Sequence, residues 1–365
     1  MSFLKRMPCL AAVPVLMAGI SAASAQSIPQ GYPADYGKLL QGATKEGVIS
    51  IYSPTDAEQA KGLISGFETA FPGIKVQWND LSSSAVYNRV VSEAAAGQVG
   101  ADVVWSNGLD LQLLLVEEGH AVAYKSPEAA NLPSWANYKD TAYLTTVEPS
   151  VFMYNKAIFK GEPPKNHGEL LALLSSKKDE LKGKVATFDP EKSAQAFVTM
   201  ATDVHVNGKF WDLVDAFGAA DGKVYSSSGQ IREKILSGEH SIGFNVNGAY
   251  AAQWAAKNPN LVVVYPTDYT ISASRAAYVS KAAPHPNAAR VFLDYMLSKP
   301  GQEAVAKAGL PSIRSDTSGD NYETANKLAS GNLKPIPLDA SLLADLEPTK
   351  RAEFFKRWKR AFQKQ

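Results

Sequence analysis

The segment VISIYSPTDAEQAKGLISGFETAFPGIKVQWND, residues 48–80, decides the fold. Residues 48–53 form a short apolar run rich in β-branched side chains, which is typical of a buried strand. The turn formers that end with Asp56 close this strand and open a helix, and Pro72-Gly73 stops that helix. Residues 74–78 alternate between apolar and polar side chains, as a second strand does. The segment therefore predicts a strand, a helix and a strand in succession.

The same alternation continues outward from this segment. Serines 82–84 precede a helical pattern that ends near Ala96, and residues 101–106 form a third apolar strand. Strand and helix patterns alternate again from residue 151 onward. A chain of 365 residues also exceeds what one hydrophobic core supports. We therefore expect an α/β protein of two lobes, with each lobe a mostly parallel sheet flanked by helices.

The N-terminus has the pattern of a signal peptide. Lys5 and Arg6 precede an apolar run at 10–20, and Ala23-Ser24-Ala25 has the small-x-small form that a signal peptidase accepts. We expect export and cleavage after Ala25, although a single apolar helix at the N-terminus is an alternative. The sole cysteine, Cys9, lies in the removed segment, so no disulfide would stabilise the mature chain.

Composition argues against several classes of protein. The 37 basic and 36 acidic side chains give a formal net charge of +1, which does not favour a domain that binds polyanions. No nucleophile elbow, dinucleotide-binding glycine motif or phosphate-binding loop is present. The five histidines are scattered without a metal-binding spacing, at positions 120, 167, 205, 240 and 285. We expect no catalytic residues, no metal and no cofactor, and an exported enzyme with the same two lobes is the alternative.

Hydroxyl and amide side chains gather where predicted strands end and predicted helices begin. In open α/β sheets, ligands bind beyond the carboxyl ends of the strands. Free backbone N–H groups at a helix start favour a negative group, and a hydroxyl adds a donor. The competing interpretation is that each of these side chains only caps a helix. The strand-end residues are Ser53, Thr55, Ser106 and Asn107, and the helix-start residues are Ser84, Ser193 and Ser228.

Several longer segments resemble the periplasmic solute-binding proteins of ABC transporters. They are GADVVWS (100–106), VFMYNKAIF (151–159), ILSGEHSIGFNVNGAYA (235–251) and YPTDYTISASRAAYVSKAAPHPNAARVFLDYMLSKPGQEAVAKAG (265–309). The likeness is to the branch that holds ferric-ion, thiamine, phosphonate and sugar-phosphate binders, and it covers about residues 36–330.

This resemblance implies a type II periplasmic-binding-protein fold, whose two lobes are joined by crossing strands and close on a ligand. We expect lobe 1 at 26–147 and 270–325, lobe 2 at 148–269, and C-terminal helices at 326–365. The hinge is expected near 147–152 and 272–279. A monomer in the periplasm would deliver its ligand to an ABC permease at the inner membrane, or would instead feed a membrane sensor.

The resemblance also suggests which residues hold the ligand. Ferric binders of this family use a His, a Glu and two adjacent Tyr, and the matching positions here are Asp56, Asn107 and Tyr250, with no second tyrosine. One carboxylate and one phenol are too few donors for a hard ferric ion. The positions that match the anion-holding loop are 193–195, with Ser228 and either Asn245 or Asn247 alongside. We therefore expect an organic phosphate, phosphonate or carboxylate. Ferric iron with a synergistic anion is the first alternative, followed by a thiamine-like cation.

Four further side chains are candidates with two interpretations each. Tyr154 and Tyr250 either contact the ligand or belong to the core or hinge. Asp268 either receives a ligand ammonium or hydroxyl group or is an exposed turn carboxylate, and Arg275 either pairs with a ligand anion or is a surface arginine. The basic and aromatic stretch at 350–362 predicts a docked terminal helix, with contact to a membrane or nucleic acid as the alternative.

The expected ligand-binding residues are Ser53, Thr55, Asp56, Ser84, Ser106, Asn107, Tyr154, Ser193, Ser228, Asn245, Asn247, Tyr250 and Asp268.

Overall fold

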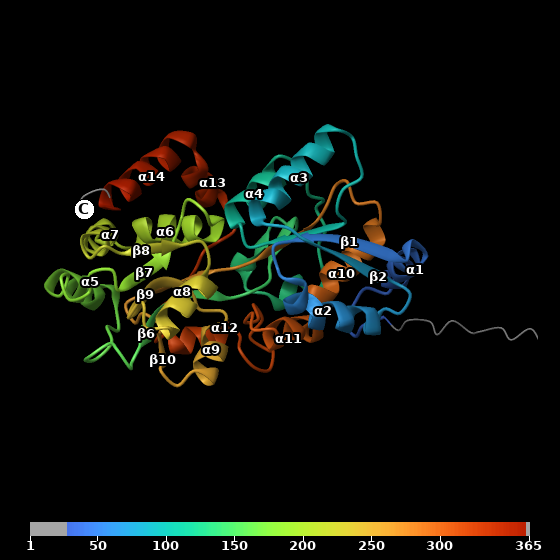
Figure 1. Cartoon of the computed structure of the whole chain (residues 1–365). Helices are drawn as coiled ribbons and strands as arrows, with labels where there is room; N and C mark the ends of the chain where they lie inside the picture. Colours follow the sequence, from blue (N-terminus) through green and yellow to red (C-terminus); the bar gives the residue numbers. More distant parts are fainter. Residues whose placement is uncertain (1–27, 363–365) are drawn as a thin grey trace, which may run out of the picture.

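The computed structural model describes residues 28–362. The predicted signal peptide and its cleavage site after Ala25 lie outside the described residues. Within the described part of the chain, no helix has both the length and the apolar character needed to cross a membrane. Figure 1 shows two α/β halves side by side, one around β1 and β2 and the other around β7, β8 and β9.

The first half, which we call the first lobe, is built on a six-stranded sheet of order β2-β1-β3-β12-β5-β4. Its first three strands are parallel, while β12, β5 and β4 pair antiparallel. The strands are β1 (Val48–Ser53), β2 (Lys75–Asp80), β3 (Val103–Ser106), β4 (Asn137–Tyr138), β5 (Ala142–Leu144) and β12 (Ala276–Val279). The helices of this lobe are α1 (Tyr36–Glu46), α2 (Ala57–Ala70), α3 (Ser83–Ala95), α4 (Leu109–Glu117), α10 (Pro286–Leu297) and α11 (Lys299–Lys307), with 3₁₀ turns at Pro127–Asn131 and Ser134–Ala136.

The second half, the second lobe, has a sheet of order β13-β11-β6-β9-β7-β8, and β10 also pairs with β6. Here β8, β7 and β9 are parallel, whereas β6 runs antiparallel to β9, β10 and β11. The strands are β6 (Glu148–Asn155), β7 (Val185–Phe188), β8 (Lys223–Tyr225), β9 (Ile242–Asn247), β10 (Leu261–Val264), β11 (Thr270–Ala273) and β13 (Leu333–Pro335). The helices are α5 (His167–Ser176), α6 (Ala194–Val206), α7 (Phe210–Ala219), α8 (Ser228–Leu236), α9 (Ala251–Lys257) and α12 (Tyr322–Leu328).

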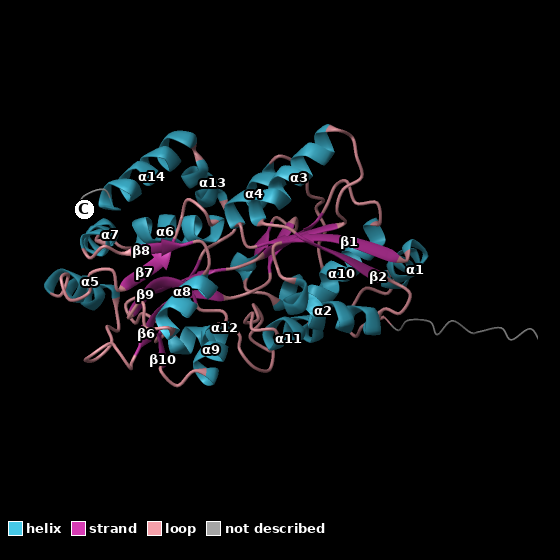
Figure 2. Cartoon of the chain, viewed as in Figure 1, coloured by secondary structure: helices cyan, strands magenta, loops and turns pink. Residues whose placement is uncertain are grey.

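The two-lobed α/β fold is confirmed, and Figure 2 shows helices around the strands of each half. The expectation of mostly parallel sheets needs a correction, because both sheets are mixed. The antiparallel pairs of β6 and β12 arise because the chain passes from one sheet to the other just before each of these strands and enters the new sheet in the reverse direction, whereas β4 and β5 pair as sequence neighbours within the first lobe. These passages lie at 145–147, between β5 and β6, and at 274–275, between β11 and β12, and the chain passes to the second lobe once more between α11 and β13.

Each lobe has its own apolar core. In the first lobe, Trp105 and Tyr278 of the sheet pack with Phe67 and Phe292 of the helices. In the second lobe, Phe152 and Phe244 pack with Phe210 and Phe217. Full burial of each such ring contributes roughly 1.5–3 kcal/mol to folding. Several second-lobe side chains, among them Phe197, Val198 and Ala201 of α6, belong to the same apolar cluster as the first-lobe core, so the lobes touch along α6.

The C-terminal segment contacts both lobes. After β13, helix α13 (Ala340–Leu346) packs against α4 of the first lobe, and α14 (Pro348–Phe362) packs against α7 of the second (Figure 1). Trp358 and Ala361 are buried, and Arg357 forms two 2.7 Å bonds to the carboxylate of Asp215. The prediction of a docked terminal helix is therefore confirmed.

Candidate ligand-binding site

A buried arginine lies at the centre of the junction between the lobes. Arg275 occupies the second crossing and is 4% exposed, so its interpretation as a surface arginine is wrong. Its Nη1 donates to Oγ1 of Thr55 over 2.8 Å, and its Nη2 reaches the hydroxyl of Tyr250 at 3.4 Å. Its guanidinium also lies over the ring of Trp105, 5.7 Å from the ring centre. The arginine therefore joins the end of β1 in the first lobe to the start of α9 in the second.

The charge of Arg275 is balanced by Glu148, the first residue of β6. Nε of Arg275 lies 2.9 Å from Oε1 of Glu148, and both side chains are almost fully buried. Burial alone would lower the pKa of Arg275, but the neighbouring Glu148 carboxylate outweighs it and holds the pKa above its usual value. A buried charge is tolerated when it is paired, so each of these residues makes the burial of the other possible.

The Glu148 carboxylate also accepts hydrogen bonds from neutral donors of the second lobe. Its Oε2 accepts from Nδ2 of Asn247 over 2.7 Å and from Nε2 of Gln195 over 3.2 Å. Its Oε1 accepts from Oγ1 of Thr146 over 2.9 Å. One carboxylate thus gathers groups from the end of β9, the first turn of α6 and the crossing segment.

Amide side chains connect the two lobes beside this carboxylate. Nδ2 of Asn107, which follows β3 in the first lobe, donates to Oε1 of Gln195 over 3.3 Å. Asn107 is held in turn by the hydroxyl of Ser83, which donates to its Oδ1 over 2.6 Å. A Cβ on Gly108 would lie 3.5 Å from Cβ of Ala194 and 3.2 Å from Cβ of Ser83. The first turns of α3, α4 and α6 therefore approach one another at the junction.

The start of α8 orients Asn247. Oγ of Ser228 accepts the backbone N–H of Asn247 over 3.0 Å, and Oδ1 of Asn247 accepts from the N–H of Ala249 over 2.9 Å. A side chain on the intervening Gly248 would come within 2.8 Å of the carbonyl oxygen of Pro149, so only glycine fits there. The Asn247 amide is consequently fixed toward Glu148.

A tyrosine makes a second contact across the junction. The hydroxyl of Tyr250 donates to Oε1 of Gln59, in α2 of the first lobe, over 3.0 Å. Burial is the main cause of the raised pKa of Tyr250, and the charge of Arg275 opposes it. The phenol therefore stays protonated and serves as a hydrogen-bond donor.

The structure brings five of the expected residues together around Arg275 and Glu148. They are Thr55, Asn107, Ser228, Asn247 and Tyr250. Ser53 and Ser106 are buried at the same strand ends, but their hydroxyls accept the backbone N–H groups of Thr55 and Gly108. These two serines shape the turns that carry Thr55 and Asn107.

Three further expected residues lie at helix starts and have local roles in this structure. The carboxylate of Asp56 caps α2 by accepting from the N–H of Glu58, and Ser193 caps α6 by accepting from the N–H of Ala196. Ser84 is exposed in the first turn of α3, whose cap is Ser82. Ser193 still borders the junction because Ala194 and Gln195 follow it directly.

Three others lie away from Arg275. Tyr154 is fully buried in the second-lobe core, with its ring centre 5.2 Å from that of Phe159. Asn245 has a left-handed φ of 54° and donates to the buried carboxylate of Asp203 over 2.9 Å. Asp268 lies 3.0 Å from Nδ1 of His167.

Sequence reasoning missed Glu148 and Gln59 and did not include Gln195 among the expected residues. A carboxylate just before the apolar run 151–153 was the one local signal for Glu148. In the sequence, Gln195 was indicated only as the last residue of segment 193–195, which matches the anion-holding loop. Among the described residues, no group of three or more His, Cys, Asp or Glu side chains is placed to hold a metal ion.

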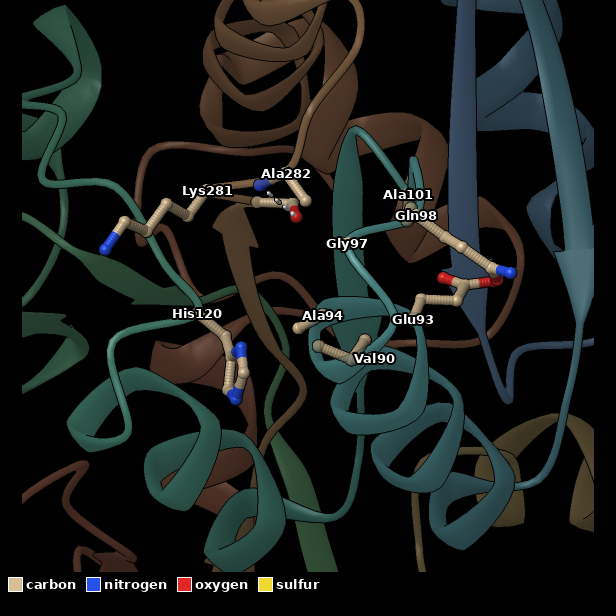
Figure 3. A pocket seen from close by; sticks show the side chains of 11 residues that line it. Val90, Glu93, Ala94, Gly97, Gln98, Ala101, His120, Lys281 and Ala282 are labelled. Atoms are coloured by element: carbon tan, nitrogen blue, oxygen red, sulfur yellow. Dashed lines mark hydrogen bonds between the residues drawn. The ribbon is translucent and has the colours of Figure 1, made fainter.

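A separate hollow of about 300 Å³ lies at the other end of the first-lobe sheet (Figure 3). It is bounded by Glu93 and Gln98 on one side and by His120 and Lys281 on the other. The Glu93 carboxylate is already bonded to the hydroxyl of Tyr52 and to Arg89. None of the expected ligand-binding residues lines this hollow.

Comparison with known proteins supports the two-lobed fold. A family described as bacterial extracellular solute-binding proteins matches residues 62–329. No curated protein sequence matches the chain. The substrate-binding protein of an ABC transporter from Agrobacterium tumefaciens is 34% identical, with a TM-score of 0.80, and the alignment covers 89% of this chain and 96% of that one.

Two more distant solved structures share the fold. The periplasmic binding protein AfuA from Actinobacillus pleuropneumoniae, with exogenous fructose-6-phosphate bound, is 20% identical with a TM-score of 0.72, over 88% of this chain and 100% of that one. Iron-bound HitA from Pseudomonas aeruginosa is 18% identical with a TM-score of 0.69, and the alignment covers 86% of this chain and 99% of that one. From its family match, its two-lobed fold and the polar junction between its lobes, the chain belongs to the bacterial extracellular solute-binding proteins.

Proposed function

We propose that this protein captures a small anionic solute between its lobes in the periplasm and delivers it to an ABC permease at the inner membrane. The observation that carries the proposal is the convergence of Asn107, Asn247 and Arg275 on one buried junction. These residues come from the first lobe, the second lobe and the crossing segment between them. A ligand held there contacts both lobes, as a closing binding protein requires.

The donors at the junction suit an anion. Arg275 supplies a guanidinium, which binds carboxylate and phosphate oxygens through paired hydrogen bonds. The amides of Asn247 and Gln195 and the first turns of α6 and α8 supply neutral donors and the positive ends of helix dipoles. We favour an organic phosphate, phosphonate or carboxylate as the ligand.

Release of the ligand requires the lobes to separate. The crossings at 145–147 and 274–275, which join strands of the two sheets directly, are the connections about which we expect the lobes to rotate. Opening breaks the bond between Tyr250 and Gln59 and the bond between Asn107 and Gln195. A ligand that contacts both lobes binds the closed form better and therefore shifts the population toward it.

Ferric iron with a synergistic anion is less well supported. Asp56, at the position of an iron-binding histidine, is exposed and caps its own helix. The hydroxyl of Tyr250 lies beside the permanent positive charge of Arg275, which opposes a trivalent cation at the same place. We infer binding and release without turnover as the activity.

A ligand screen on the mature protein tests the proposal. The panel contains fructose 6-phosphate, a simple phosphonate, a dicarboxylate, inorganic phosphate and ferric citrate. We expect one of the organic anions to raise the melting temperature progressively, since a ligand at one hundred times its Kd stabilises by about 2.7 kcal/mol. A panel without effect argues against the proposal. Tight ferric binding with a phenolate-to-iron absorption band supports the iron alternative, and conversion of a panel member supports an enzyme.

A further inference from the structure

The side chains expected to hold a ligand anion already hold a carboxylate of the protein. Oε2 of Glu148 receives the amides of Asn247 and Gln195, and Oε1 faces Nε of Arg275. Oε1 also receives the hydroxyl of Thr146. The Glu148 carboxylate therefore has the contacts that the carboxylate or phosphate group of a ligand would make at this place.

A second buried arginine in the same protein is bonded more completely than Arg275. Arg314 in the first lobe donates from Nη1 to Glu128 over 2.6 Å, and its Nε and Nη2 donate to both oxygens of Asp316 over 2.7 and 2.8 Å. These charge-assisted bonds include a bidentate pair, which is the strong geometry for arginine.

Arg275 is bonded much less completely. Its Nε lies 2.9 Å from Glu148, yet among the described residues this buried N–H has no aligned hydrogen-bond acceptor. Within residues 28–362, the one hydrogen bond of its Nη2 is the 3.4 Å contact to the hydroxyl of Tyr250. A buried arginine with poorly used donors has spare capacity for an anion, whereas Arg314 does not.

We propose that Glu148 is an internal competitor for the ligand: it occupies the anion donors of the closed, ligand-free protein, and an incoming oxyanion takes over Asn247, Gln195 and Arg275 from it. This inference rests on the proposed function and adds a determinant of affinity. Without ligand, Glu148 neutralises Arg275 and satisfies the buried amides. With ligand, its negative charge lies next to the ligand anion and opposes binding. The site therefore retains only oxyanions that bind these donors better than a carboxylate already in place.

The test is calorimetric titration of the mature wild-type protein and the variant Glu148→Gln with inorganic phosphate at constant ionic strength. Glutamine keeps the shape and removes the competing charge, so Arg275 attracts phosphate more strongly. We expect phosphate to bind Glu148→Gln at least tenfold more tightly than the wild type. Equal or weaker binding by the variant, including no binding by either protein, overturns the proposal.

Glu128→Gln is the matched control, because it neutralises one partner of the other buried arginine pair, within the first lobe. Both variants are expected to melt at a lower temperature than the wild type, but Glu128→Gln is expected to leave phosphate affinity unchanged. A tenfold gain in the control as well overturns the proposal, because the gain would then follow from destabilisation.

If Glu148→Gln does not fold, Glu148→Asp takes its place. The shorter side chain draws the carboxylate away from Asn247 and Gln195, so phosphate is expected to bind more tightly than to the wild type, and unchanged affinity overturns the proposal. Failure of the competitor role of Glu148 can be distinguished from failure of the proposed function. If an organic anion of the panel binds the wild-type protein but the Glu148 variants gain nothing for phosphate, only the competitor role is lost.

Discussion

The hydroxyl of Tyr250 in the second lobe donates to the side-chain amide oxygen of Gln59 in the first lobe over 3.0 Å. These residues are 191 positions apart in the chain. The bond spans the junction next to Arg275, so it stabilises the closed arrangement of the lobes and is lost when they separate.

Replacement of Tyr250 by phenylalanine is therefore expected to favour the open form. A net hydrogen bond contributes about 0.5–1.5 kcal/mol, which corresponds to a several-fold shift in the closed population. The radius of gyration of the ligand-free protein, measured by small-angle scattering, should increase. The control is Tyr278→Phe, since the Tyr278 hydroxyl is buried in the first-lobe core with no hydrogen-bond partner among the described residues. Equal radii for wild type and Tyr250→Phe would contradict the role of this bond.

Arg275→Gln is expected to destabilise the protein more than a surface change does. It leaves the Glu148 charge buried without its partner, and loss of one member of a buried pair costs about 3–5 kcal/mol. The double variant Arg275→Gln with Glu148→Gln removes both charges and should recover much of that stability. Urea unfolding of the four proteins in this cycle measures the coupling. Additive losses would mean that the two side chains do not form a functional pair.

Two serines predicted from the sequence are expected to differ in effect. Ser228→Ala removes the acceptor of the buried Asn247 N–H, which costs about 1–3 kcal/mol and misdirects the Asn247 amide. Ser193→Ala removes only a helix cap, worth about 1 kcal/mol. We expect Ser228→Ala to weaken oxyanion binding clearly more than Ser193→Ala in isothermal titration. The reverse order would place the anion at the α6 cap instead.

We expect the buried carboxyl group of Asp110 to make the stability of the protein depend on pH. It lies in the first turn of α4, is 1% exposed, and neither carboxylate oxygen has an aligned hydrogen bond among the described residues. Burial raises its pKa to about 6, and the first-turn N–H groups and Arg351 offset this only in part. The folded protein therefore binds a proton that the unfolded chain releases near its ordinary pKa of 3.8, and stability falls as the pH rises from about 4 to about 6.

Asp110→Asn removes this loss. Its free energy of unfolding should exceed that of the wild type by about 3 kcal/mol at pH 7, from a shift of about two pH units. The two proteins should converge below pH 4, where the wild-type carboxyl is protonated in both states. Denaturant unfolding at pH 4 and pH 7 measures the difference. An equal difference at both values would show that ionisation of Asp110 is not its cause.

Much of the fold was predictable because local patterns determine it. The alternation in 48–80 gave β1, α2 and β2 with small errors at their ends. The long-range pairing was not predictable in the same way. The antiparallel pairs of β12 and β6 depend on where the chain returns between lobes, and no short segment encodes that direction.

The site was predicted in part for the same reason. Thr55 and Asn107 follow strand ends, and strand ends are visible in the sequence. Arg275 and Glu148 become partners only because the two crossing segments pair, with Ala273 opposite Glu148. Tyr154 was expected as a possible ligand contact because an aromatic strand residue does not reveal which face of the sheet it occupies. In the structure, the Tyr154 side chain lies in the second-lobe core.

The most direct test of an anion site shared by both lobes is the position of bound arsenate, a phosphate analogue that anomalous X-ray scattering locates in crystals of the mature protein. We predict arsenic between the lobes, with the arsenate oxygens bonded to Asn247 and Gln195 of the second lobe and to Arg275. Three results would contradict an anion site shared by both lobes: arsenate in the hollow beside Lys281, arsenate elsewhere on the surface of a single lobe, or no ordered arsenate.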